Sequence, residues 1–423
     1  MSDISSRETV TVAVVGAGQA GLAIGHYLNE AGIDHVILEG GSRVGDSWRA
    51  RWDSLRLFTP AKYDGLPGLP FPAPAGSFPT KDETAQYLET YVDHFGLPVR
   101  LGVRVERLSR EGDGYVLAAG GRTITARHVV VATGAHQTKR IPVWGATLDE
   151  SILQLHGADY RNPTQLQPGP VLVVGAGNSG AEIAIEVAHA GHPTQLAGNS
   201  TGQIPKIAQS FNGLFFWYLA NKIFSIDTRI GRKVRPQAQA HGGPLIRLSF
   251  KDVTAAGVEL VARVAATIDG WPLLEDGRRV EVSNVIWCTG FGHDFSWIDL
   301  PGWSSDTLPN HDRGVAPAQP GLYFIGLPFL TKLASAFIGG VGEDAHHVVA
   351  TITARLQAGQ TTNLQGGGVR HPQATASRAF APPPWVGTSR AARIPPRHTP
   401  PARQQVTDVA PRGAARRMSV DGP

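Results

Sequence analysis

Glycines at a fixed spacing after an apolar segment are the residues with the clearest chemical role. Gly16, Gly18 and Gly21 follow the apolar residues 12–15 and precede a segment with helical periodicity. The first glycine permits a tight turn, the second lets the backbone approach a pyrophosphate, and the third lets the helix pack closely on the strand. The N–H groups at the helix N-terminus favour an anion. Glu39 ends the next apolar segment, where it would accept hydrogen bonds from ribose hydroxyls.

The same motif occurs a second time further along the chain. Gly175, Gly177 and Gly180 follow the apolar residues 171–174, and Ala190-Gly191 repeats Ala31-Gly32 at the same offset. Two such units predict two bound dinucleotides. We expect one to be a flavin and the other a nicotinamide that reduces it.

A further apolar segment ending in Thr-Gly follows each glycine motif. Residues 129–132 lead into Thr133-Gly134, and residues 285–288 lead into Thr289-Gly290. We interpret each segment as the strand that closes one nucleotide-binding unit. The small residues at its end suit a place where the chain passes close to a cofactor and crosses between domains.

Local signals predict several other elements. Residues 80–83 form a capping box that begins a helix. Residues 99–117 are typical of short strands, with a hairpin turn at 112–114. Residues 321–326 predict another buried strand. The glycine-rich segment after it would start a last helix that ends near Leu356 and directs backbone N–H groups toward a reduced flavin.

Residues 211–224 are strongly apolar and aromatic but too short to span a bilayer. Three interpretations stay open: a helix that lines a substrate channel, a contact with a membrane surface, or a core or interdomain helix. Four basic residues follow, and a solvated basic face is the favoured interpretation for them over a phosphate clamp. They are Arg229, Arg232, Lys233 and Arg235.

Composition narrows the class of protein. The 423 residues suffice for two or three domains. No apolar run reaches the ~18 residues that cross a bilayer, and the first nine residues lack the apolar core of a signal peptide. The single cysteine, Cys288, excludes an internal disulfide and a redox-active cysteine pair. His346 and His347 have no neighbours at metal-ligand spacing. We therefore expect a cytoplasmic enzyme with no transmembrane segment and no metal.

The basic character of the chain comes from its end. Residues 361–423 hold nine Arg, no Lys, two Asp and ten of the 31 prolines, so they carry +7 and the remainder carries −3. Little apolar surface is present to offset the entropy of ordering, so we expect a disordered tail. It has the charge to contact nucleic acid or an anionic surface, although a solvated appendage is favoured. Nucleic-acid binding by the rest of the chain is not supported.

The two glycine motifs, the Thr-Gly endings and residues 156–163 (HGADYRNP) resemble the flavin-containing monooxygenases, in the bacterial and plant branch that includes indole-pyruvate monooxygenases. The resemblance covers about residues 10–355. It implies an α/β fold with two Rossmann-like, three-layer dinucleotide-binding domains, the second inserted into the first. Residues 1–165 plus 291–358 would bind FAD, and residues 166–290 would bind NAD(P)H.

The sequence departs from the family pattern at two places. Glu150 and Ile152 stand where the family's linker motif has Phe and Gly, so that motif is half present. Residues 49–80 contain no Asn, although many members carry one near the flavin. Thr59 is the candidate neighbour of the flavin in its place.

The resemblance implies that reduced nicotinamide passes hydride to FAD, and that the reduced flavin and O2 form a C4a-hydroperoxide that delivers one oxygen atom to a small organic substrate. We assign no catalytic side chain. His156 is interpreted as part of an interdomain linker rather than as a base. Two alternatives stay open: an NAD(P)H-dependent reductase or oxidase that passes electrons to a quinone or another acceptor, and a non-catalytic FAD-binding regulator. The sequence does not predict the substrate or the oligomeric state.

The choice of nicotinamide depends on the second motif. When the two motifs are superposed in sequence, Glu39 corresponds to Gly198, so no acid is present to repel a 2′-phosphate. Asn199 replaces the arginine that the family usually has, while Ser200 and Lys206 would bond to the phosphate and supply charge. NADPH is therefore expected, with NADH as the alternative.

The residues expected to contact the two cofactors come from the glycine motifs, the segments after the second strands, the loop after Glu39 and the Thr-Gly endings. They are Gly16, Gly18, Gln19, Ala20, Gly21, Glu39, Gly40, Asp46, Ser47, Trp48, Thr59, Val105, Ala132, Thr133, Gly134, Gly175, Gly177, Asn178, Ser179, Gly180, Asn199, Ser200, Lys206, Thr289, Gly290 and Gly342.

Overall fold

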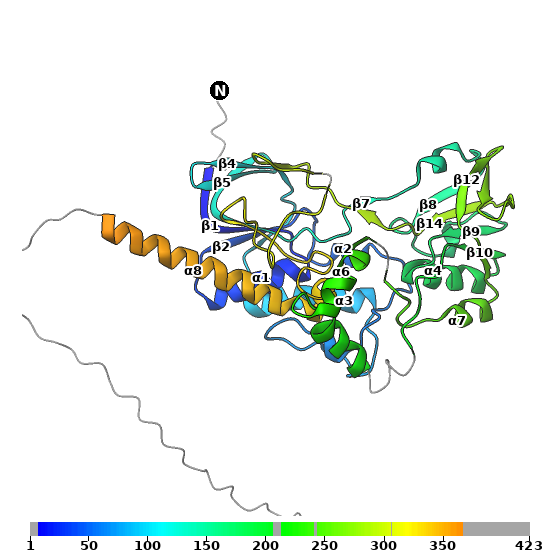
Figure 1. The fold of residues 1–423 in the computed structure, drawn as a ribbon, viewed down its shortest axis with the longest axis horizontal. Coiled ribbons are helices and arrows are strands. Elements are labelled where there is room, and N and C mark those ends of the chain that lie inside the picture. The colour runs from blue at the N-terminus through cyan, green and yellow to red at the C-terminus, as the bar shows by residue number, and fades with distance from the viewer. Residues whose placement is uncertain (1–6, 206–212, 241–242, 306, 367–423) are drawn as a thin grey trace, which may run out of the picture. The chain divides into compact units, whose positions relative to one another are not determined.

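The first apolar segment forms β1 (Arg7–Val15), a central strand of an eight-stranded sheet in the computed structural model, which describes residues 7–205, 213–240, 243–305 and 307–366 (Figure 1). β1 pairs in parallel with β2 (His35–Leu38) and with β6 (Arg122–Val131). The other strands are β3 (Val99–Arg100), β4 (Val105–Glu111), β5 (Gly114–Ala119), β16 (Ile298–Asp299) and β17 (Leu322–Phe324). The expected hairpin turn at 112–114 is confirmed, because β4 and β5 pair antiparallel around it.

Successive side chains of β1 point to opposite faces of the first sheet, and each face has its own hydrophobic core. Val12 and Val14 pack against three helices: α1 (Gln19–Glu30), α3 (Lys81–Phe95) and α8 (Gly342–Gly366). Ala13 and Val15 face the opposite side, where strands β4–β6 and residues 295–300 cover them. Figure 1 shows α1 and α8 beside β1 and β2. Because side chains of a strand alternate between its two faces, the glycine turn after β1 lies between a layer of helices and a layer of strands.

Local sequence signals mark the start of α3 and the ends of α1 and α4. In α3 the Thr80 hydroxyl accepts from the Glu83 N–H at 3.1 Å, and the Glu83 carboxylate accepts from the Thr80 N–H at 2.7 Å, which confirms the capping box. After α1 the chain turns at Gly32 (φ +62°), and after α4 (Asn178–His189) it turns at Gly191 (φ +92°). A left-handed glycine stops both helices at equivalent positions.

A second sheet of five parallel strands contains the second glycine motif. Its order is β11 (Glu259–Val261), β10 (Thr194–Ala197), β9 (Val171–Val174), β14 (Asn284–Trp287) and β8 (Leu153–His156). Helices α4 and α7 (Phe250–Ala255) contribute to the core on one face. The hairpin of β12 (Val264–Ile268) and β13 (Trp271–Leu274) contributes to the core on the other. The expected mixed α/β class is confirmed, with two sheets rich in parallel strands.

Two chain crossings connect the sheets. The outgoing strand β7 (Thr138–Lys139) pairs antiparallel with the returning strand β15 (Phe291–Gly292), after which β16 and β17 rejoin the first sheet. The chain enters the second sheet at Leu153, earlier than the expected boundary at residue 166. The register explains the difference, because Leu153 and Val171 pair with the same residue, Asn284, on opposite sides of β14.

The last helix is longer than expected. α8 continues to Gly366, past Leu356 and past the expected domain end at 358. No proline occurs between 357 and 366, and the single glycine before Gly366, Gly359, costs a helix only about 1 kcal/mol. The helix thus extends into the first residues of the expected disordered tail, 361–423. Residues 367–423 lie outside the described part of the chain, and the disorder of the tail stays a prediction.

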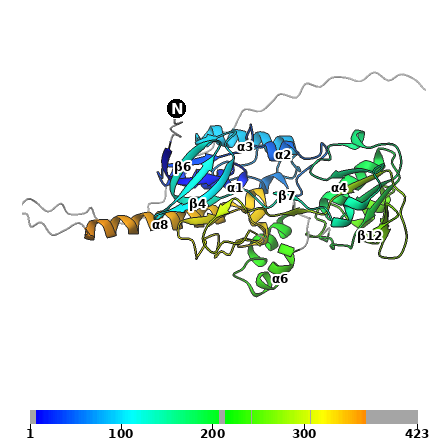
Figure 2. The same ribbon diagram turned by 90° about the horizontal axis from the view of Figure 1, so that it is seen from above.

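The remaining helical elements lie outside the two sheets. They are α2 (Asp46–Arg49), α6 (Arg229–Ala240), η1 (Ala61–Tyr63), η2 (Val143–Thr147), η3 (Pro163–Gln165), η4 (Leu219–Ile223), η5 (Leu333–Ala336) and η6 (Ile338–Gly340). Figure 2 shows α6 apart from the strands of both sheets. Within the described ranges, no helix has both the length and the apolar character needed to cross a bilayer.

Candidate nucleotide-binding and active site

The first glycine turn has the geometry that its spacing predicts. Gly16 has φ +106°, and an added Cβ would lie 2.7 Å from the Ala132 carbonyl oxygen. A Cβ on Gly21 would lie 1.9 Å from the Gly16 carbonyl oxygen. A Cβ on Gly18, in contrast, would meet no atom within 4 Å. Two of the glycines are therefore required for packing, while the middle one leaves an open face at the start of α1.

The second turn repeats this arrangement residue for residue. A Cβ on Gly175 (φ +114°) would lie 2.2 Å from the Cys288 carbonyl oxygen, and one on Gly180 would lie 1.8 Å from the Gly175 carbonyl oxygen. A Cβ on Gly177 would again meet nothing within 4 Å. The two motifs thus build the same open cradle twice.

Both cradles lie at uncapped helix N-termini. Gly18 and Gly177 are the N-cap residues of α1 and α4, and neither helix has a side-chain cap. The N–H groups of Gln19, Ala20 and Gly21, and those of Asn178, Ser179 and Gly180, therefore belong to first turns that no side chain satisfies. This arrangement binds phosphate groups.

Glu39 is held firmly beside the first cradle. Its carboxylate accepts from the Ala17 N–H and from the Gly41 N–H, both at 2.8 Å. The exposed Gly40 lies against the Arg104 side chain, since an added Cβ would meet that guanidinium at 3.5 Å. Val105 follows as the first residue of β4. Sequence reasoning did not indicate Arg104 here, because the contact depends on the register between β2 and the 102–104 segment.

The loop after Glu39 is organised by Asp46. Its carboxylate accepts from the Ser42 hydroxyl and from the Arg43 N–H, both at 3.0 Å. Ser47 is exposed, and the half-buried Trp48 packs against the helix-covered cores of both sheets. The carboxylate of Asp46 therefore shapes the loop, while Ser47 and Trp48 have surface to offer a cofactor.

Thr59, the expected neighbour of the flavin, forms a buried pair that the sequence did not indicate. Its hydroxyl donates to Asp64 at 2.5 Å. The Asp64 side chain has no exposed surface, and its second carboxylate oxygen has no hydrogen-bond partner among the described residues. Burial raises the pKa of Asp64 to about 7. A buried, half-satisfied carboxyl group is typical of a functional site.

The second cradle differs from the first in the residues around it. The Asn178 side chain donates to the Pro244 carbonyl and accepts from the Ile246 N–H, both at 3.0 Å, so only its backbone N–H is free for a cofactor. Asn199 and Ser200 are exposed just after β10. Ser200 accepts from the Gly202 N–H at 3.1 Å. Lys206 lies outside the described residues.

The Thr-Gly endings are connected by hydrogen bonds across the two crossings. The Gln137 amide donates to the Thr133 hydroxyl at 2.7 Å and to the Gly134 carbonyl at 3.0 Å. The same amide accepts from the Asp294 N–H, and the Thr289 hydroxyl donates to the Arg140 carbonyl. Gln137 was not expected as a site residue. It holds the end of β6 to the returning chain.

His156 joins the second sheet to the returning crossing. Its Nδ1 accepts from the Ala158 N–H, so Nε2 carries the proton and donates to the Gly290 carbonyl, each at 3.1 Å. Burial lowers the pKa of His156. A neutral ring with both nitrogens bonded to backbone suits the expected linker role and has no free nitrogen to act as a base.

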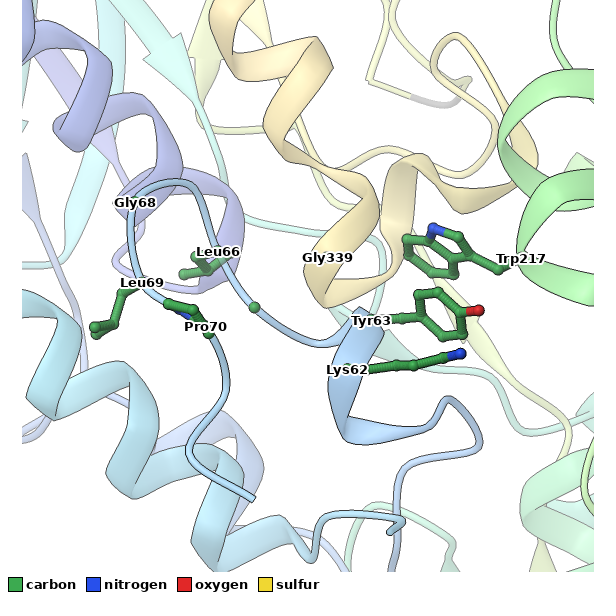
Figure 3. Close-up of a pocket in the computed structure, with 9 residues that line it drawn as sticks. Lys62, Tyr63, Leu66, Gly68, Leu69, Pro70, Trp217 and Gly339 are labelled. Atoms are coloured by element: carbon green, nitrogen blue, oxygen red, sulfur yellow. The ribbon is translucent and has the colours of Figure 1, made fainter. Parts of the chain in front are cut away.

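A cavity of about 540 Å³ lies beside the Thr59–Asp64 segment. Figure 3 shows the Trp217 and Tyr63 rings stacked, with centroids 4.7 Å apart, and Lys62 on the other face of Tyr63 at 4.6 Å. The lining comprises Lys62, Tyr63, Gly65, Leu66, Gly68, Leu69, Pro70, Trp217 and Gly339. The lining combines apolar and aromatic side chains with exposed polar groups.

η6 and the start of α8 pack against this loop, while their expected approach to a flavin stays a prediction. A Cβ on Gly339 would lie 1.8 Å from the Tyr63 carbonyl oxygen, and one on Gly342 would lie 3.0 Å from the Pro67 ring. η6 and the first residue of α8 therefore pack directly against residues 63–67, which include Asp64.

Comparison with known proteins identifies the family. A family model described as pyridine nucleotide-disulphide oxidoreductase matches residues 13–209. An uncharacterized CzcO-like oxidoreductase from Geobacillus kaustophilus is 37% identical over 82% of this chain and 99% of its own length. A probable indole-3-pyruvate monooxygenase of Arabidopsis thaliana is 28% identical over 77% of this chain and 84% of its own. A solved flavin-containing monooxygenase from Stenotrophomonas maltophilia matches with a TM-score of 0.67 and 28% identity, over 82% of this chain and 99% of its own. The chain belongs to the flavin-containing monooxygenase family.

Membership of this family confirms the resemblance expected from the two motifs and makes the chain a flavin-dependent oxidoreductase of the monooxygenase type. The name of the matching family model includes disulphide chemistry, but the chain's one cysteine, Cys288, provides no redox pair. No cluster of metal-ligating side chains occurs within the described ranges.

Proposed function

We propose that the chain is a monooxygenase with two Rossmann-type dinucleotide-binding domains, the second inserted into the first. The domain with β1–β6, β16 and β17 would hold FAD at Gly18 and Glu39. The domain with β8–β14 would hold NADPH at Gly177 and Asn199. The observation that carries the proposal is the duplicated cradle: two middle glycines with open faces, each at an uncapped helix N-terminus.

The preference for NADPH rests on a difference between the two cradles. In the first, the Ala17 N–H is occupied by Glu39 at 2.8 Å. In the second, a Cβ on Gly198 would lie 2.9 Å from the equivalent Ala176 nitrogen, and Gly198 has no side chain to place there. Gly198 therefore presents no carboxylate and no like charge to a 2′-phosphate.

The residues around the cavity define how the substrate is held. When bound, FAD accepts hydride from the nicotinamide and supplies the reaction with O2. The Trp217 ring and the side chains of Leu66 and Leu69 give this cavity apolar surface for a small organic substrate, and Gly339 packs on the Tyr63 backbone at its edge. The names of the plant relatives make indole-3-pyruvate, a flat acid, one compound to test.

Anaerobic titration of the purified protein tests the proposal. We expect a bound flavin spectrum that NADPH bleaches, with kcat/KM for NADPH at least tenfold above that for NADH. Bleaching by NADH in preference to NADPH would contradict the coenzyme assignment. A flavin that neither coenzyme bleaches would mean that the second cradle does not serve as a nicotinamide site.

A further inference from the structure

Residues 213–240, which we call the helical hairpin, carry an unusual share of the exposed apolar surface. Residues 213–218 are α-helical, η4 follows, and α6 returns. Nine large apolar side chains are exposed among the described residues, and four of them lie on this hairpin. They are Leu214, Phe215, Tyr218 and Ile230, each more than half exposed. Their concentration within the short segment 214–230 marks an interaction surface.

The hairpin is nevertheless anchored to the protein. Phe216 and Ala220 are buried against Ile246 and Ala334. Ser225 pairs with Lys332 as an antiparallel bridge, and Asp227 forms an ion pair with Arg313. Because the hairpin is packed in this way, its exposed side chains belong to a segment that is held in place.

The charge of the hairpin is strongly positive. It holds five basic residues and one acid, Asp227, which Arg313 already neutralises. Arg229 and Lys233 are exposed, lie one helical turn apart on α6 and flank Ile230. Arg232 is exposed beside them, where its charge acts on Asp227, and neither Arg229 nor Lys233 forms an ion pair with a described carboxylate. The hairpin therefore presents both exposed apolar side chains and exposed positive charge.

This surface adjoins the candidate substrate cavity. A second cavity of about 250 Å³ is lined in part by Leu214, Trp217 and Tyr218. It shares Trp217 and Gly339 with the 540 Å³ cavity shown in Figure 3. Trp217 thus lies between the exposed face of the hairpin and the loop that carries Tyr63.

We propose that the helical hairpin docks on an anionic phospholipid surface. Leu214, Phe215, Tyr218 and Ile230 enter the boundary between headgroups and acyl chains, while Arg229, Arg232 and Lys233 contact lipid phosphates. Docking places the two cavities at the membrane surface, where an apolar substrate is concentrated. A second copy of the chain would fit this surface poorly. A two-fold symmetric dimer would bring Arg229 and Lys233 of both copies together, and their charges would repel.

Flotation of the full-length, flavin-loaded protein with lipid vesicles tests the docking surface. One set of vesicles contains phosphatidylcholine and phosphatidylglycerol at a ratio of two to one, and the other contains phosphatidylcholine alone. We expect at least tenfold more binding to the mixed, anionic vesicles, and loss of most of that binding in about 0.5 M salt. Equal binding to both kinds of vesicle, or none to either, would overturn the proposal.

Variants separate the hairpin from the arginine-rich residues 361–423, which also carry positive charge. The apolar variant combines Leu214→Ser with Phe215→Ser, and the charge variant combines Arg229→Glu with Lys233→Glu. Each should lower binding to anionic vesicles at least fivefold. The matched controls, Leu260→Ser with Ile268→Ser and the single change Lys251→Glu, alter exposed residues elsewhere and should bind as the parent does.

Measurements of folding and of oligomeric state separate vesicle binding from the proposed enzymatic activity. An unchanged flavin spectrum and melting temperature show that a variant is folded, and Ile230→Ser alone offers a milder change if a double variant is not. Binding that persists in both hairpin variants would assign it to residues 361–423 and overturn the proposal. Loss of a dimer in the apolar variant, without any binding to vesicles, would assign the face to self-association and also overturn it.

Discussion

The backbone N–H of Ala17 donates to the carboxylate of Glu39 at 2.8 Å, which fixes an acid beside the first glycine cradle. The equivalent N–H of Ala176 faces Gly198, which has no side chain. The chain thus contains two copies of the same strand–turn–helix unit. The first copy has a negative charge beside the alanine N–H, and the second copy has none. This asymmetry suits a free ribose hydroxyl in the first cradle and a phosphorylated ribose in the second.

Changing the charge after β10 should change the choice of coenzyme. Asn199→Glu places a carboxylate beside the expected 2′-phosphate, so KM for NADPH should rise at least tenfold while KM for NADH changes little. Asn199→Arg should lower KM for NADPH, because a guanidinium pairs with phosphate. Steady-state kinetics with both coenzymes measure this. Equal effects on the two coenzymes would contradict the assignment.

The two middle glycines should separate the two cofactors. Gly18→Val adds a side chain where no atom lies within 4 Å, so the protein should fold but lose most of its flavin. The matched change Gly177→Val should retain the flavin and slow its anaerobic reduction by NADPH at least tenfold. Flavin content per protein and the bleaching rate are the measurements. A Gly177→Val protein that lacks flavin would contradict the division of roles.

Asp64 should make stability depend on pH. Its pKa is about 7 in the folded chain against 3.8 for the ordinary group, because burial disfavours the carboxylate. The unfolded chain therefore releases this proton first, and the free energy of unfolding should fall between about pH 4 and pH 7 by up to about 4 kcal/mol.

Asp64→Asn removes this titration while leaving an oxygen to accept from Thr59. The variant should melt at a higher temperature than the parent at pH 8 and close to the parent at pH 5. Thermal melts of both proteins across this range provide the measurement. Parallel curves for the two proteins would show that Asp64 does not titrate in this window.

Cys288 should be dispensable for turnover. Cys288→Ser retains size and removes the only thiol, so NADPH-dependent flavin reduction and oxygen consumption should stay within about twofold of the parent. A disulphide reductase that used this thiol would lose its activity instead. Assays of both proteins in parallel, at equal flavin content, distinguish the two.

The features that sequence reasoning predicted correctly are those that local spacing determines. Turn geometry follows from the interval between Gly16, Gly18 and Gly21, and the Thr80 capping box follows from four consecutive residues. Arg104, Gln137 and Asp64 were missed because their roles depend on which segments the sheets bring together. The helix α8 continues past the expected end near Leu356 because the sequence has no strong stop signal before residue 366. The cytoplasmic location, and the state of residues 367–423, stay predictions.

The central claim is that a bound flavin, once reduced by NADPH, would use O2 to oxygenate a substrate. The most direct test reduces the protein anaerobically with one equivalent of NADPH, admits air, and follows O2 uptake and hydrogen peroxide release together. We predict that O2 is taken up at least tenfold faster than peroxide appears, and that a substrate lowers the final yield of peroxide. Peroxide released in step with O2 uptake, in full stoichiometric yield with every substrate tested, would contradict the account and favour an NADPH oxidase or reductase.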